Sequence, residues 1–134
     1  MPTVFVYGTL TDRETASAVL DTFEYRGKAT LRGLSRADGR YPTLAPGETT
    51  DGRLLSTPDI AVLDRYEGVD RGLYVRCAVP AVGGEAGPVE TDTVDCYVGD
   101  PGLLDAPAQW PGDDLFAERV RRYVRDNDVR VVRG

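Results

Sequence analysis

The sequence predicts a single α+β domain covering residues 1–134, because of its length and the way its strand-like and helix-like segments are distributed. A chain of 134 residues has the usual size of one domain and buries most of its surface on folding. Strand-like runs occur in clusters with only three helical patterns, which is typical of α+β proteins. No apolar run approaches the roughly 20 residues that span a bilayer, so we expect no membrane segment.

The N-terminal segment predicts a strand, a turn and a helix. Val4–Tyr7 is a short β-prone run and is followed by Gly8–Leu10. Thr11–Glu14 then matches a capping box, which predicts a helix over Asp12–Leu20. The first N–H groups of a helix have no intrahelical partner, so here they can favour an anion beside the turn.

Strands and irregular connections make up most of the remaining chain. β-branched and aromatic residues predict strands at Tyr25–Leu34, Gly52–Ser56, Leu73–Val82 and Thr93–Val98, and an edge strand at Val129–Val132. Glycine and proline predict an irregular loop at Tyr41–Gly47, a flexible turn at Gly83–Pro88 and a connection at Pro101–Gly112. An amphipathic pattern after that connection predicts a last helix over Asp114–Arg125.

A second helix is predicted over Pro58–Glu67. Thr57 can cap it, and Gly68 is a natural terminating residue. At about 100° per residue, Glu67 falls on the apolar stripe of this helix. Burial there raises the pKa of a carboxyl group towards neutrality, as a general base or acid requires. Periodicity alone leaves an alternative, since Glu67 is also in the last turn, where a helix end can fray.

Composition excludes several classes of function. A net charge of −6 opposes binding to a phosphate backbone, so we expect no nucleic-acid partner. The chain has no histidine, which removes most metal and haem sites, and we expect no metal and no cofactor. Cys77 and Cys96 are expected to be buried packing residues. The N-terminus lacks the basic region of a signal peptide, so we expect a cytoplasmic protein, either monomeric or a weak homodimer.

The balance of charged residues suggests adaptation to salt. Lys28 is the only lysine among 16 basic residues, and acidic residues number 22. Such a surface stays hydrated in strong salt, so a halophilic source is one hypothesis. The alternative is that GC-rich coding favours arginine over lysine.

Two motifs together resemble the gamma-glutamylcyclotransferase-like superfamily, in its gamma-glutamylamine cyclotransferase and avirulence-induced-gene-like branch. The first is the Tyr-Gly-Thr-Leu of Tyr7–Leu10, and the second is the Leu-Asp-x-x-Glu-Gly of Leu63–Gly68. A Tyr-x-Arg strand follows at Tyr74–Arg76, and Tyr41-Pro42 resembles the family's Tyr-Pro loop. Each fragment alone is weak, but their order and spacing are specific.

The resemblance implies a small, mixed, β-barrel-like sheet flanked by helices, with a pocket between the Tyr7–Leu10 turn and Glu67. It implies that the α-amino group of a gamma-glutamyl amine or amino acid attacks its own side-chain carbonyl, releasing 5-oxoproline and a free amine without a cofactor. Glu67 matches the catalytic glutamate. The N–H groups of Gly8, Thr9 and Leu10 would hold either the substrate carboxylate or the oxyanion.

Several roles stay open at this point. Tyr7, Tyr41 and Tyr74 are candidate substrate-binding residues, although packing or surface placement explains each of them as well. Tyr74 and Arg76 share a strand face and can line the pocket rim, although structural packing is the favoured role for both. A non-catalytic module with the same pocket is the alternative to an enzyme, since a shared fold does not establish function. An enzyme that cleaves larger gamma-glutamyl adducts would use the same residues.

Overall fold

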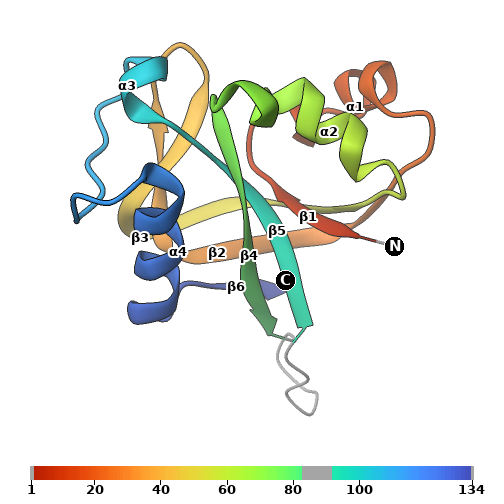
Figure 1. Ribbon diagram of the computed structural model, residues 1–134. Helices are drawn as coiled ribbons and strands as arrows, with labels where there is room; N and C mark the ends of the chain where they lie inside the picture. The colour runs from red at the N-terminus through yellow and green to blue at the C-terminus, as the bar shows by residue number, and fades with distance from the viewer. Residues whose placement is uncertain (1, 83–91, 134) are drawn as a thin grey trace.

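Six strands close into a barrel in the computed structural model, which describes residues 2–82 and 92–133. The strands are β1 (Thr3–Val6), β2 (Glu24–Asp38), β3 (Pro42–Ser56), β4 (Tyr74–Val82), β5 (Asp92–Gly99) and β6 (Arg130–Arg133). Their order around the barrel is β1-β3-β2-β6-β4-β5, and a parallel pairing of β1 with β5 closes it (Figure 1). With the flanking helices, this confirms the α+β barrel-like fold class.

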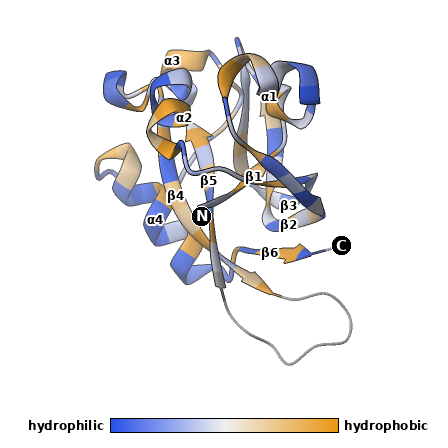
Figure 2. Ribbon diagram, turned by 90° about the vertical axis from the view of Figure 1, so that its right-hand side faces the viewer, coloured by the Kyte–Doolittle hydropathy of each residue, from blue (hydrophilic) through white to orange (hydrophobic). Residues whose placement is uncertain are grey.

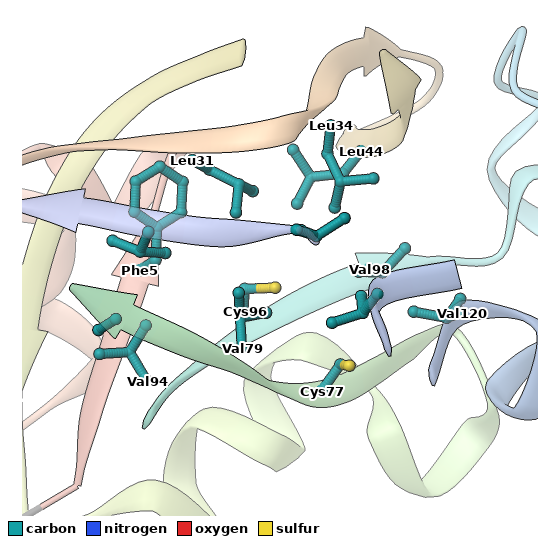
Figure 3. Close-up of a cluster of buried hydrophobic side chains, with 14 of the residues drawn as sticks. Phe5, Leu31, Leu34, Leu44, Cys77, Val79, Val94, Cys96, Val98 and Val120 are labelled. Carbon is teal, nitrogen blue, oxygen red and sulfur yellow. The ribbon is translucent and has the colours of Figure 1, made fainter. Parts of the chain in front are cut away.

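The barrel interior holds the larger hydrophobic core. Figure 3 shows Phe5, Leu31, Leu34 and Leu44 facing residues of β4 and β5 across the barrel. Cys77 and Cys96 lie in the same core as free, buried thiols, as predicted. Burial raises the pKa of both thiols, which makes them poor nucleophiles.

Four helices flank the barrel. They are α1 (Arg13–Val19), α2 (Ile60–Glu67), α3 (Pro101–Leu104) and α4 (Phe116–Asp126). α1 and α2 lie side by side against one wall, whereas α4 lies on the opposite side of the molecule (Figure 1). Val4 and Val6 pack outward in the cluster that includes Leu63 of α2, while Phe5 between them points into the barrel. Strand alternation thus buries both faces of β1 and fixes the direction of its last residues.

The predicted irregular loop at Tyr41–Gly47 is wrong, because β3 begins at Pro42 and pairs with β2 through that stretch. Proline is tolerated here for two reasons. Pro42 is the first residue of its strand, and Pro46 pairs with Leu34 beside a register shift in β2. Pairing with a long partner strand therefore overrides the local turn signal.

The C-terminal part also departs from prediction. β6 is no edge strand, because it lies between β2 and β4 in the closed barrel. Its middle is coloured as hydrophobic in Figure 2, as expected for a strand that contributes to the core. The connection at Pro101–Gly112 contains α3, whose first N–H groups are capped by Asp100. The predicted turn at Gly83–Pro88 lies outside the described residues.

Both predicted helix caps are displaced. Asp12 caps α1 by accepting from the N–H of Thr15, so Thr11 is not the capping residue and a 3₁₀ turn, η1 (Thr9–Thr11), separates β1 from α1. α2 begins at Ile60, and Thr57 binds the N–H of Asp59 just before it. Within residues 2–82 and 92–133, no helix has the length and apolar character needed to cross a bilayer.

Candidate active site

A pocket of about 330 Å³ opens where the end of β1 meets the last turn of α2. This volume suits a small metabolite. The pocket wall brings together all seven residues singled out from the sequence, which are Tyr7, Gly8, Thr9, Leu10, Tyr41, Glu67 and Tyr74. Arg76 is not among its lining residues. Tyr66, Arg71 and Tyr97 line it as well and were not predicted.

The turn after β1 presents unpaired N–H groups. Its carbonyl groups are held by protein donors: Arg36 binds that of Tyr7, Thr11 that of Gly8, and Tyr25 that of Leu10. The N–H groups of Gly8, Thr9 and Leu10 have no protein acceptor among the described residues. A run of free N–H groups in a pocket wall is suited to bind an anion.

Glu67 is the last residue of α2 and lies half-buried in the pocket. Burial raises the pKa of its carboxyl group from 4.5 to about 7. Desolvation has this effect because it disfavours the charged form. The described residues give this carboxylate no ion-pair partner, so nothing compensates the loss of hydration. The group can therefore gain and lose a proton near neutral pH.

The tyrosines beside Glu67 use their hydroxyl hydrogens within the protein. Tyr7 donates to the carbonyl oxygen of Tyr97 at 2.6 Å, and Tyr74 donates to that of Pro42 at 2.6 Å. Burial is the main reason that the pKa of both phenols is raised. Nearby groups, which include Glu67, raise it further. Both hydroxyls stay neutral, and each offers a ligand the acceptor side of its oxygen.

The comparison with protein families decides the assignment. Residues 4–115 match the family described as gamma-glutamyl cyclotransferase, AIG2-like. The chain belongs to this family. A comparison with curated proteins gives no match.

Solved structures support the same fold. A structure described as gamma-glutamyl cyclotransferase is similar with a TM-score of 0.62 and 19% identity, over 74% of this chain and 66% of that one. An uncharacterized protein from Homo sapiens gives 0.62 and 21%, over 73% and 66%. This chain therefore spans just under two thirds of the length of either protein. A protein from Arabidopsis thaliana gives 0.58 and 28%, over 94% and 85%.

A network of polar side chains joins α2, the helix that carries Glu67, to the strands β4 and β5. Asp64 of α2 accepts a hydrogen bond from the Tyr97 hydroxyl at 2.7 Å and pairs with Arg76 at 3.0 Å. Arg76 also pairs with Asp95 at 3.3 Å. Of the two roles left open for Arg76, the structural one is confirmed, because these two carboxylates hold its guanidinium and it does not line the pocket. Sequence analysis missed Tyr97 because its position opposite Arg76 depends on the pairing of β5 with β4.

The pocket mouth is aromatic. Tyr41 is 58% exposed and Tyr66 is 44% exposed. The Tyr66 hydroxyl lies 3.3 Å from that of Thr9, which links the two family motifs at the surface. In the part of the chain that the structure describes, no three histidine, cysteine, aspartate or glutamate residues form a group that could hold a metal ion.

Proposed function

We propose that this protein is a cyclotransferase that converts gamma-glutamyl amines or gamma-glutamyl amino acids into 5-oxoproline and a free amine. The observation that carries this proposal is the pairing of Glu67, with a pKa of about 7, and the free N–H groups of Gly8–Leu10 in one pocket. Membership of the family supports the reaction class.

Glu67 acts as the proton carrier. In its ionised form it takes a proton from the α-amino group of the gamma-glutamyl unit, whose nitrogen then attacks the γ-carbonyl carbon. A C–N bond forms to close the five-membered ring, and the C–N bond to the leaving amine breaks. Glu67 returns its proton to the leaving nitrogen, and the ring nitrogen loses its second proton to solvent, so that Glu67 ends the cycle ionised. Because the attack is intramolecular, the pocket mainly fixes the reactive conformer.

The two sides of the pocket suit the two ends of the glutamyl head group. The hydroxyl oxygens of Tyr7 and Tyr74 can accept from its ammonium group, since their hydrogens are already donated to backbone carbonyls. The N–H groups of Gly8, Thr9 and Leu10 can donate to its carboxylate or to the oxyanion of the tetrahedral intermediate. Tyr41 covers the substrate from the rim in this proposal.

The reaction needs only groups of the chain and the substrate, so the proposal includes no cofactor and no metal. The partner is a small molecule, and neither nucleic acid nor a membrane takes part. A cytoplasmic location, where gamma-glutamyl metabolites are available, and a monomeric or weakly dimeric state complete the proposal.

The test is release of 5-oxoproline from a panel of gamma-glutamyl amino acids and gamma-glutamyl-lysine, with wild type and Glu67→Gln. The amide has nearly the same shape but cannot accept the proton, so we expect turnover to fall by at least about 100-fold with the fold retained. Glu48→Gln, at an exposed position on β3, is the matched control and should keep wild-type turnover. Equal turnover in Glu67→Gln and wild type, with matched circular dichroism, would assign the base to another residue.

A further inference from the structure

Arg71 is the one cationic side chain among the described residues that line the pocket. It ends the short 3₁₀ turn η2 (Val69–Arg71), which follows α2 directly. Its guanidinium lies against the end of that helix, since a Cβ placed on Gly68 would be 2.7 Å from Arg71 Nη2. The cation is therefore held beside the residue that follows Glu67.

The guanidinium of Arg71 has no protein partner in the described residues. No ion pair or side-chain hydrogen bond involves it, whereas other arginines, such as Arg36, Arg76 and Arg122, pair with aspartate. Arg71 itself is exposed. An unpaired cation at a pocket wall keeps all of its donors available to a ligand, and its planar fork matches a carboxylate.

The position of Arg71 distinguishes two parts of the pocket. The inner part contains the buried Tyr74, the half-buried Tyr7 and Glu67, and in the proposed function it holds the glutamyl unit. The outer part contains Arg71 with the exposed rings of Tyr41 and Tyr66. A leaving amine must depart through the outer part, so its substituents meet Arg71 while the reaction occurs.

We propose that Arg71 is a specificity-determining residue that binds a carboxylate on the leaving group, and that the preferred substrates are gamma-glutamyl amino acids with a free carboxylate. This inference rests on the proposed cyclotransferase function. Neutral leaving amines lack the matching charge, and cationic ones, such as polyamines, are repelled by the guanidinium. The free N–H groups of Gly8–Leu10 remain available for the glutamyl unit, so the pocket has separate donors for two anionic groups.

The test compares gamma-glutamyl-alanine with gamma-glutamyl-alaninamide, which differ only at the leaving-group carboxylate. In wild type we expect kcat/KM for the acid to exceed that for the amide by about tenfold, as a charge-assisted hydrogen bond allows. Arg71→Gln should lower kcat/KM for the acid alone and bring the ratio near one, and Arg71→Lys should restore part of it. Arg65→Gln removes the same charge from an exposed position of α2 outside the pocket and should leave the ratio unchanged.

Two kinetic outcomes would overturn the inference. An equal loss for acid and amide in Arg71→Gln would assign Arg71 to the glutamyl carboxylate or to structure, and a wild-type ratio near one would remove the specificity claim. Binding of both compounds to Glu67→Gln, with and without Arg71→Gln, separates this inference from the proposed function. Selective binding of the acid without any turnover by wild type refutes the function but supports the carboxylate site, whereas binding of neither compound refutes both.

Discussion

Glu67 should make the protein less stable at alkaline pH, and Glu67→Gln should remove that loss. Burial raises the pKa of this carboxyl group to about 7 in the folded protein, while in the unfolded chain it titrates near 4.5. The folded state therefore binds the proton more tightly. Its contribution to stability is complete below about pH 4.5 and is lost as the pH rises through 7.

The size of the effect follows from the two pKa values. Each pH unit between them is worth about 1.4 kcal/mol, and integration of the proton linkage from about pH 5.5 to 8.5 gives a loss of about 2 kcal/mol in the free energy of unfolding. The half-buried carboxylate keeps part of its hydration, so this value is the upper end of the expected change. A lower limit of about pH 5.5 also avoids the isoelectric point near 4.6, where association is favoured.

Urea denaturation of wild type, Glu67→Gln and the control Glu48→Gln measures this directly. All other titrating groups are shared, so the stability difference between wild type and Glu67→Gln isolates the effect of Glu67. Between the two pH values, we expect the free energy of unfolding of Glu67→Gln to gain about 1–2 kcal/mol relative to that of wild type. The free energy of unfolding of Glu48→Gln should depend on pH as that of wild type does. If the free energy of unfolding changes with pH in the same way in all three proteins, a raised pKa at Glu67 is refuted. The base proposed for catalysis is then refuted with it.

The remaining predictions concern rate, packing and salt. The kcat/KM of wild type should rise with pH along a limb with an apparent pKa near 7, because the base must be ionised; a limb near 4.5 in a pH-rate profile would contradict this. Asp64→Ala should cost about 1–3 kcal/mol in urea denaturation, because the buried Tyr97 hydroxyl loses its acceptor; a loss no larger than that of the exposed Asp70→Ala would argue against the network. The thermal midpoint should rise from low salt to about 2 M KCl, since ions screen the net charge of −6 over a Debye length of about 3 Å near 1 M; a flat or falling midpoint would rule out salt adaptation.

Local sequence was enough to predict most helices and strands, including β1, whose partners β3 and β5 lie far along the chain. The β1 strand, the three longer helices and the β4 strand lie within a few residues of their predicted bounds. Prediction failed for the first half of β3, which pairs with the neighbouring strand β2, and for the edge position of β6, which pairs with both β2 and β4. Pro46 gives a local turn signal, but the neighbouring β-bulge lets it pair with Leu34. Strand pairing thus overrode the local turn signal in β3, and closure of the barrel decided the position of β6.

The candidate site shows the same division. Glu67 and the Tyr7–Leu10 turn lie in motifs that can be read along the chain, and the structure brings them into one pocket. Tyr97 reaches that pocket through the pairing of β5 with β4 and with β1, which no local pattern encodes. The position of Arg71, three residues after Gly68, can be read from the sequence. The structure shows that a short 3₁₀ turn places it beside the end of α2. Its lack of a partner could be known only from the structure.

The position of Glu67 at a helix end, which periodicity leaves open to fraying, is fixed by the glycine after it. Gly68 has a left-handed backbone with φ of 73°, and its N–H closes the last turn on the carbonyl of Arg65 at 3.1 Å. Its own carbonyl accepts from the N–H groups of Arg71 and Leu73, both at 3.0 Å. A side chain here would be strained and would meet the Arg71 guanidinium. A raised pKa requires a carboxyl group that stays desolvated, and Gly68 supplies that constraint because it locks the chain on both sides of the turn. The glycine of the Leu-Asp-x-x-Glu-Gly motif therefore acts on the chemistry through Glu67, while the same turn holds Arg71 at the mouth of the pocket.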